Sequence, residues 1–216
     1  MAIRTILFDN DGTLVDTYDM ILASFRHATQ KVLGRQFSEA EYMAKVGQPL
    51  ATQMWDFTND PKVHQDLLAS YRAHNESTHD QLVKAFPGIV DQLSALKAAG
   101  FSMGVVTSKM HALAWRGLQV VGAAPYMDCL VGADDCEKHK PDPAPILLGC
   151  QRMGAAPAEC IYVGDSPFDI AAGNAAGCKT LAVTWGMFDE AELLAENPSA
   201  VVRLVGELVE TIQGLK

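Results

Sequence analysis

Two aspartates separated by a single residue, Asp9 and Asp11, have the side-chain type and spacing that catalysis or cation binding requires. They follow an apolar run, residues 6–8, that is typical of a short buried strand, and Gly12 then lets the chain turn. Strand side chains alternate between faces, so extended geometry would point both carboxylates the same way. At about 4 Å and an effective dielectric constant near 20, they repel each other by roughly 4 kcal/mol. The pair therefore indicates a bound cation, a shared proton or a function, although an isolated Asp-x-Asp-Gly is more often a solvated turn.

Polar side chains also follow the next three predicted strands. These strands are predicted over residues 101–106, 129–131 and 160–163, and the polar groups after them are Thr107 and Ser108, then Lys140, then Asp165 and Asp169. Ligands of parallel sheets bind beyond the carboxyl ends of the strands. We therefore expect all these groups to meet Asp9 and Asp11 at one edge of a sheet.

Strands and helices alternate in the second half of the chain. A further strand is predicted over residues 180–183, and helices are predicted over residues 89–99, 110–121, 144–153, 167–176, 190–195 and 202–212. Short apolar strands that alternate with helices are typical of a doubly wound parallel sheet. The predicted fold class is therefore α/β.

A long segment separates the first two strands. A crossover between parallel strands needs only about a dozen residues, yet residues 9–100 lie between them. Helical periodicity predicts helices at 21–33, 38–46, 49–57 and 63–71, with a capping box at Ser38-Glu-Ala-Glu41. We therefore expect a core of residues 1–16 and 86–216, and a smaller all-helical domain of residues 17–85 that stands over the strand ends.

Composition excludes several classes of function. The 216 residues carry a net charge of −9, which disfavours nucleic acid or an anionic membrane as a partner. We expect a cytoplasmic protein, because no apolar stretch is long enough for a bilayer and an aspartate comes too early for a signal peptide. The five cysteines form no Cys-x-x-Cys pair, as in a protein with reduced thiols. Dinucleotide-binding, P-loop and serine-hydrolase signatures are missing from the sequence.

Four sequence motifs together resemble those of the haloacid dehalogenase superfamily. They are Phe8-Asp-x-Asp-Gly-Thr-Leu-Val-Asp16-Thr, Val106-Thr-Ser-Lys, Lys140-Pro and Gly164-Asp-x-x-x-Asp169. The resemblance covers the whole chain, and residues 17–85 look like the small helical cap of that family. It implies a Rossmann-like core, Mg²⁺ as cofactor and a small phosphorylated metabolite as substrate. Oligomeric state is not encoded in these motifs, and we expect a monomer or a small homo-oligomer.

The resemblance also implies a role for each motif residue. Asp9 would be the nucleophile that forms an aspartyl phosphate, and Asp11 the general acid and base. Mg²⁺ would be held by the Asp9 side chain, the Asp11 backbone carbonyl and Asp165. Asp169 would support the metal site or anchor Lys140, whose charge would stabilise the nucleophile and the phosphate.

Other residues are predicted to contact the substrate. Thr107, the Ser108 backbone N–H and Gly12 would bind phosphoryl oxygens, while Lys45 and Gln48 lie in a segment similar to the cap loop that inspects the leaving group. Lys109 is interpreted as solvent-facing, and Asp16 and Thr17 as the hinge into the cap.

Single residues separate the branches of the family. The dehalogenase and phosphonate-cleaving branches lack the second aspartate, so Asp11 disfavours both. A phosphosugar mutase remains an alternative, although the mutase that can be compared has a histidine where this chain has Ile21. The core motifs Gly164–Gly177 and Val183–Gly186 look most like the phosphoglycolate phosphatase and pyrophosphatase group. We therefore predict a phosphatase.

Two non-enzymatic alternatives remain open. A signalling receiver domain also forms an aspartyl phosphate on a parallel sheet, but it has no large insert after the first strand and its phosphoacceptor lies on a middle strand. A silent binding protein of the same fold would not need all four motifs intact.

Overall fold

A six-stranded parallel sheet forms the centre of the computed structural model, which describes residues 3–215. The strand order is β5-β4-β1-β6-β7-β8, and every neighbouring pair is parallel. Met1, Ala2 and Lys216, which the predicted core ranges include, lie outside the described residues. The strands are β1 (Thr5–Phe8), β4 (Ser102–Val106), β5 (Cys129–Val131), β6 (Cys160–Gly164), β7 (Lys179–Val183) and β8 (Ala200–Val202). The predicted doubly wound α/β fold is confirmed.

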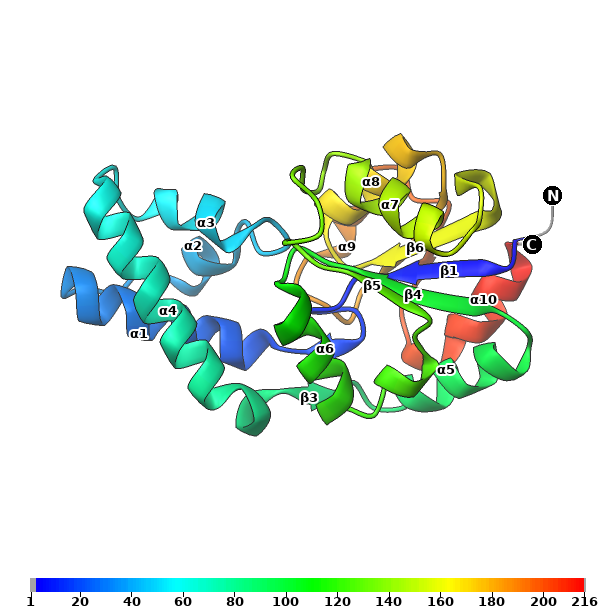
Figure 1. Cartoon of the computed structure of the whole chain (residues 1–216), viewed down its shortest axis with the longest axis horizontal. Helices are drawn as coiled ribbons and strands as arrows, with labels where there is room; N and C mark the ends of the chain where they lie inside the picture. The colour runs from blue at the N-terminus through cyan, green and yellow to red at the C-terminus, as the bar shows by residue number, and fades with distance from the viewer. Residues whose placement is uncertain (1–2, 216) are drawn as a thin grey trace.

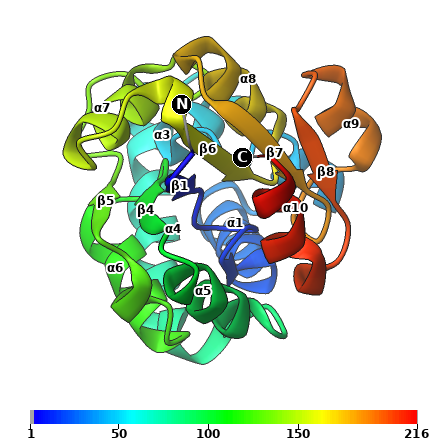
Figure 2. The same cartoon turned by 90° about the vertical axis from the view of Figure 1, so that its right-hand side faces the viewer.

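Helices cover both faces of the sheet (Figure 2). One layer contains α5 (Ile89–Ala98), α6 (His111–Val120) and α10 (Leu208–Gly214), and the other contains α7 (Ala144–Arg152) and α8 (Pro167–Ala176). Strand β1 shows why two layers are needed. Ile6 and Phe8 belong to one buried cluster and Leu7 to another, as alternation along a strand requires. Because β1 lies between β4 and β6, its carboxyl end opens at the middle of the sheet, where ligands of such folds bind.

The chain end departs from the sequence prediction. The predicted helix at 202–212 is wrong in its first half, because residues 200–202 form strand β8 and α10 begins only at Leu208. Strand β8 pairs with β7 from Leu181 to Val183. The apolar residues Val202, Val205 and Val209 also fit helical spacing, but pairing with the neighbouring strand decides the local structure here.

Four helices extend beyond the carboxyl ends of the strands (Figure 1). They are α1 (Tyr18–Leu33), α2 (Glu39–Met43), α3 (Leu50–Gln53), followed by a 3₁₀ turn (Met54–Asp56), and α4 (Pro61–Leu82). They pack around a buried cluster of their own that includes Phe25 and Tyr42. The predicted capping box of Ser38 and Glu41 starts α2, but α2 ends three residues before the predicted limit, whereas α4 is longer than expected.

Two short strands connect these helices to the sheet region. β2 (Val15–Asp16) leads into α1, β3 (Lys84–Ala85) follows α4, and the two strands pair antiparallel. The outgoing and returning chains thus run side by side, and the Asp16 carboxylate accepts a hydrogen bond from the Tyr18 N–H at the start of α1 (3.3 Å). Of the helices in residues 3–215, none has the length and apolarity to cross a membrane.

Another short element, α9 (Glu190–Ala195), lies between β7 and β8 and matches its predicted range. Its residue Leu193 packs with Ile170 of α8 and Ala182 of β7 in a small buried cluster. The loop between β7 and α9 returns over the strand ends, where Trp185 donates its indole N–H to the Thr13 carbonyl (3.1 Å). This loop therefore closes one side of the site described next.

Candidate active site

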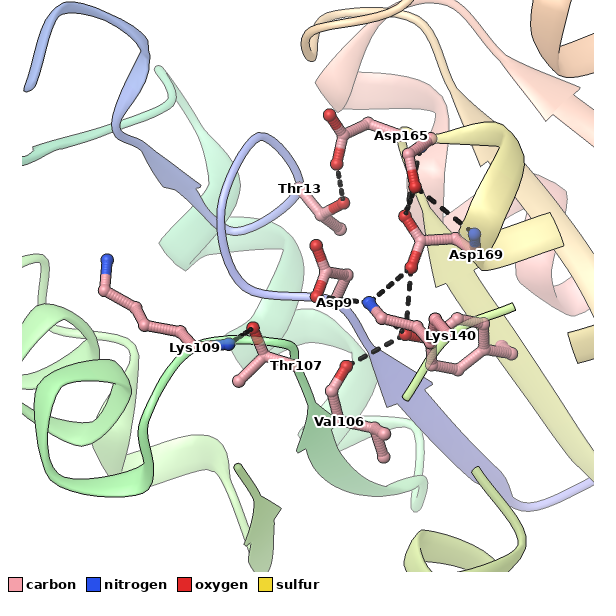
Figure 3. Close-up of polar contacts among 10 residues, drawn as sticks. Asp9, Thr13, Val106, Thr107, Lys109, Lys140, Asp165 and Asp169 are labelled. Carbon is pink, nitrogen blue, oxygen red and sulfur yellow. Dashed lines mark hydrogen bonds and ion pairs between the residues drawn. The ribbon is translucent and has the colours of Figure 1, made fainter. Parts of the chain in front are cut away.

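Three buried carboxylates converge at the carboxyl ends of β1 and β6 (Figure 3). Asp9 follows β1, Asp165 follows β6, and Asp169 lies in the first turn of α8. Each offers an oxygen within 4.8 Å of the others, and the three residues are at most 4% exposed. The structure thus brings together three acids that lie far apart in the sequence.

Lys140 enters the same cluster from the loop after β5. Its Nζ lies 2.8 Å from Asp9 Oδ1, 2.5 Å from Asp169 Oδ1 and 3.1 Å from the hydroxyl of Tyr162. Tyr162 donates to the carbonyl of Val106 (2.9 Å), which fixes the hydroxyl beneath the lysine. Of the two roles predicted for Asp169, the ion pair with Lys140 is present in the structure.

Asp169 is itself held by the start of α8. Its Oδ2 accepts hydrogen bonds from the hydroxyl (2.5 Å) and the N–H (3.1 Å) of Ser166, while its own N–H donates to Ser166 Oγ (3.2 Å). This reciprocal capping box uses one carboxylate oxygen for the helix and leaves the other for Lys140. The helix start therefore positions the lysine through Asp169.

Negative charge in the cluster is undercompensated. Burial raises the pKa of Asp9 to about 7, with the Lys140 charge opposing this shift and the charges of Asp169 and Asp11 adding to it. Burial also raises the pKa of Asp165 well above its usual range, helped by the charges of Asp169 and Asp9. Within residues 3–215, the Lys140 ammonium pairs with Asp9 and Asp169, whereas Asp165 has no ion-pair partner. Closely spaced oxygen ligands with excess negative charge fit a hard divalent cation such as Mg²⁺.

The Asp165 side chain is fixed from two sides. Thr13 donates its hydroxyl to Oδ1 (2.7 Å), and the Met187 N–H donates to Oδ2 (2.9 Å). Two glycines press against the same carboxylate: a Cβ on Gly12 would lie 2.2 Å from Asp165 Oδ2, and one on Gly186 would lie 2.2 Å from Asp165 Cβ. Gly12 also has φ +85°, a conformation that favours glycine.

Gly12 was predicted to contact phosphate. Its N–H donates to the Val15 carbonyl (2.8 Å), so Gly12 does not offer a free backbone donor to the substrate. The close approach to Asp165 is the packing reason for a glycine here. The structure therefore places Gly12 beside the carboxylate cluster as part of the turn.

Asp11 forms an ion pair that the sequence analysis missed. Lys109 Nζ lies 2.7 Å from Asp11 Oδ1, and the two side chains are 11% and 16% exposed, so the interpretation of Lys109 as solvent-facing is wrong. Burial alone would raise the pKa of Asp11, but the Lys109 charge and the hydrogen bond that Lys109 donates to Asp11 lower it. Asp11 is therefore ionised in this arrangement.

Thr107 and Ser108 follow β4 next to Asp9. The buried Thr107 hydroxyl accepts the Lys109 N–H (3.2 Å), which is the strand-end turn expected of an ordinary threonine in this position. Ser108 Oγ is buried and lacks a hydrogen-bond partner among residues 3–215. Both residues and both motif aspartates line one cavity, so they face the space that a phosphoryl group would occupy.

This cavity, about 560 Å³ in volume, lies between the strand ends and helices α1, α3, α4 and α6. The predicted cap residue Gln48 lines it, and Gln53 Nε2 donates to the Gln48 carbonyl (2.7 Å). Lys45 instead pairs with Asp56 on the surface (2.6 Å) and does not line the cavity. The sequence analysis also missed several lining residues that belong to no motif, including Tyr71, Arg72 and Arg116.

The chain is similar in sequence to known hydrolases. The sequence profile of the haloacid dehalogenase-like hydrolases matches residues 6–183. Pyrophosphatase PpaX of Bacillus pumilus is 34% identical over 211 residues, which is 98% of this chain and 97% of the relative. Pyrophosphatase PpaX of Bacillus velezensis is 35% identical, with 99% of this chain and 98% of the relative covered.

Solved structures share the fold over almost the whole chain. A crystal structure of a predicted phosphatase from Clostridium acetobutylicum has a TM-score of 0.90 at 25% identity and covers 99% of this chain and 100% of the other. A predicted phosphoglycolate phosphatase from Haemophilus somnus also has a TM-score of 0.90, at 24% identity, with 98% of each chain covered. The chain belongs to the haloacid dehalogenase-like hydrolase family. The prediction that it is a phosphatase of this family is confirmed.

Proposed function

We propose that this enzyme is a Mg²⁺-dependent phosphatase of a small phosphorylated metabolite and that it acts through an aspartyl phosphate on Asp9. The observation that carries the proposal is the position of Asp9. Its carboxylate is held from behind by Lys140 (2.8 Å) and lines a cavity that Asp11, Thr107 and Ser108 also line. A buried nucleophile, a second acid and phosphate-binding hydroxyls thus face the same space.

The first half-reaction transfers the phosphoryl group to the enzyme. An oxygen of the Asp9 carboxylate attacks phosphorus, the bond from phosphorus to the leaving oxygen breaks, and Asp11 donates a proton to that oxygen. Thr107 and Ser108 donate hydrogen bonds to the transferring phosphoryl oxygens. Lys140 keeps the nucleophile oriented and stabilises the added negative charge.

The second half-reaction releases phosphate. Water attacks the phosphorus of the aspartyl phosphate, Asp11 accepts a proton from that water, and the Asp9 carboxylate is regenerated. Lys109 favours the ionised form of Asp11 that this step needs, since the two groups are paired at 2.7 Å. The first step needs the protonated form, so we expect the Asp11–Lys109 pair to open when substrate binds.

A metal ion fits the carboxylate cluster, on the charge balance and oxygen ligands described above. Asp9 and Asp165 side chains and the Asp11 backbone carbonyl would hold it, with Asp169 nearby. Mg²⁺ in this position would compensate the charge of the phosphoryl oxygens. The fixed orientation of Asp165 by Thr13 and the Met187 N–H suits a ligand of that kind.

Substrate selection is assigned to residues 17–85, since α1, α3 and α4 supply the wall opposite Asp9. The relatives named pyrophosphatase and the structural neighbour named phosphoglycolate phosphatase make pyrophosphate and phosphoglycolate the first compounds to test. Ile21 lines the cavity where the mutase considered above has a histidine, so this position offers no acid or base. A mutase is therefore not proposed.

The test is phosphate release from a panel of phosphorylated metabolites with Mg²⁺ and with a chelator. We expect many turnovers per chain with Mg²⁺, loss of activity with chelator, and loss in Asp9→Asn. Labelling that stops at one phosphate per chain would instead identify a receiver-like switch. Undiminished turnover by Asp9→Asn would remove the proposed nucleophile.

A further inference from the structure

We propose that the physiological leaving group is an organic anion, with an apolar part that packs in the cavity and a second acidic group that Arg72 binds. This inference rests on the proposed phosphatase function and narrows its substrate class. It makes an organic phosphomonoester, rather than inorganic pyrophosphate, the better substrate. Arg72 is then a specificity-determining residue supplied by α4.

Apolar side chains from both sides line the cavity beyond the catalytic residues. Phe25 comes from α1, Leu50 from α3, Met110 from the loop before α6 and Leu113 from α6. Met110 is 48% exposed, so it is a large apolar side chain that a bound ligand would cover. The volume of about 560 Å³ falls within the roughly 300–1,000 Å³ typical of sites for organic ligands. Pyrophosphate has no apolar surface to bury against these side chains.

The cations that line this cavity differ in whether they are already paired. Lys109 is paired with Asp11 (2.7 Å), and Arg116 is paired with Asp80 (2.8 Å). Arg72 also lines the cavity, and it has no hydrogen-bond or ion-pair partner within residues 3–215. A guanidinium binds carboxylate or phosphate in a bidentate manner, so Arg72 offers an unused anion-binding group.

Glu76 lies one helical turn beyond Arg72 and also lines the cavity. Its charge acts on Arg116: the pKa of Arg116 is raised mainly by hydrogen bonding to Asp80, with the charges of Asp80 and Glu76 adding to this effect. Arg116 is paired with Asp80, and within the described residues no ion pair joins Glu76 to Arg72. Arg72 is left for an anion that comes with the ligand.

Arg72 is also connected to the reacting end of the cavity through its neighbour. Tyr71 is buried and lines the cavity, and its pKa is raised by burial and by the charge of Asp11. Tyr71 and Asp11 thus line the same cavity, and Arg72 follows Tyr71 on α4 as an exposed residue of its wall. A leaving group that extends from Asp11 along α4 would bring its far end to Arg72.

The experiment compares two aryl phosphates whose phenols have similar acidity, 4-(carboxymethyl)phenyl phosphate and 4-ethylphenyl phosphate, with pyrophosphate as a third substrate. The wild-type enzyme should show kcat/KM at least tenfold higher for the carboxylated ester than for the ethyl ester or for pyrophosphate. Arg72→Ala should abolish the preference for the carboxylated ester, and Arg72→Lys should retain part of it. A tenfold preference corresponds to about 1.4 kcal/mol.

Lys62→Ala is the matched control, because Lys62 is an exposed cation on the same helix that does not line the cavity. It should keep the full preference. Faster hydrolysis of pyrophosphate than of both esters, no effect of the carboxylate, or an unchanged preference in Arg72→Ala would each overturn the inference. All three leave the proposed function standing if phosphate release still requires Asp9. Release of no phosphate from any of these three substrates would also overturn the inference, whereas the proposed function is decided by the metabolite panel.

Discussion

The two ends of the cavity are built in opposite ways. At the sheet end, Asp9, Asp169 and Lys140 are nearly inaccessible to solvent and paired with one another. At the opposite end, Arg72 is exposed and unpaired within the described residues, and most of the lining residues that precede it in the sequence, from Ile21 to Tyr71, are apolar. Buried charges must be neutralised by specific partners, whereas an exposed side chain on a helix has no such requirement. The first end is therefore rigid and suited to chemistry, and the second is free to vary with the substrate.

The largest expected effect tests the rigid end. Asp9→Asn removes the nucleophile but keeps the shape and lowers the buried charge, so turnover should fall on the order of 10⁴-fold or more while the protein stays folded. Phosphate release and the circular dichroism spectrum measure the two parts of this prediction.

Asp11→Asn is the companion variant, in which phosphoenzyme should accumulate because the attacking water loses the base that accepts its proton. An Asp11→Asn enzyme with normal turnover and no trapped phosphate would remove Asp11 from acid and base catalysis.

Lys140→Ala should be the most destabilising single change at this end. It leaves Asp9 and Asp169 buried without their cation, and breaking such a pair costs about 3–5 kcal/mol in the free energy of unfolding. Urea denaturation checks the value. The control is Lys138→Ala, since Lys138 is 69% exposed and pairs with Asp142 on the surface, and its loss should cost no more than about 1 kcal/mol. Equal losses in the free energy of unfolding for the two variants would contradict the conclusion that the buried carboxylates depend on Lys140 for charge compensation.

Binding of Mg²⁺ should stabilise the fold more at high pH than at low pH. Without a divalent ion, the pKa of Asp9 is raised to about 7, so the folded state binds a proton that the unfolded state releases. The stability that this bound proton contributes is fully present at pH values below the pKa of Asp9 in the unfolded state. It is lost as the pH rises through 7. Mg²⁺ competes with this proton, so its effect should grow as the proton leaves.

Thermal unfolding with and without Mg²⁺ at pH 5.5 and pH 8 measures this difference. At a hundred times the dissociation constant, the ion contributes about 2.7 kcal/mol, which raises the melting temperature by roughly 5–10 °C for a chain of this size. Gly186→Ala should reduce the Mg²⁺ effect, because its Cβ would displace Asp165. A shift that is larger at pH 5.5 would contradict the site.

The sheet end was largely predictable from the sequence. Asp9, Thr107 and Asp165 each follow an apolar strand pattern, and parallel topology requires the ends of such strands to meet. Lys109 was missed because an isolated lysine in a loop is usually solvent-exposed. A usable signal was its position, because it stands three residues after a predicted strand that ends at the edge of the sheet where ligands bind.

Other features depend on tertiary contacts that local patterns do not contain. Strand β8 forms because β7 offers an edge, although residues 202–212 by themselves fit a helix. The ribbon of β2 and β3 joins two segments of two residues each, too short to show strand periodicity. Arg72 looks like any polar residue of an amphipathic helix, and only the arrangement of α4 over the strand ends puts it in the cavity.

The smallest expected effect compares two residues of the loop between α2 and α3. Gln48 lines the cavity, so Gln48→Ala should lower kcat/KM by about twofold to tenfold, the value of one ordinary hydrogen bond of about 0.5–1.5 kcal/mol. Lys45 is 45% exposed and paired with Asp56 away from the cavity, so Lys45→Ala should change kcat/KM less than about twofold. Asp56→Ala, which frees the same lysine, should behave in the same way. Steady-state kinetics on the best substrate decide between the two positions. A larger loss of kcat/KM in Lys45→Ala than in Gln48→Ala would mean that the loop rearranges and brings Lys45 to the bound leaving group.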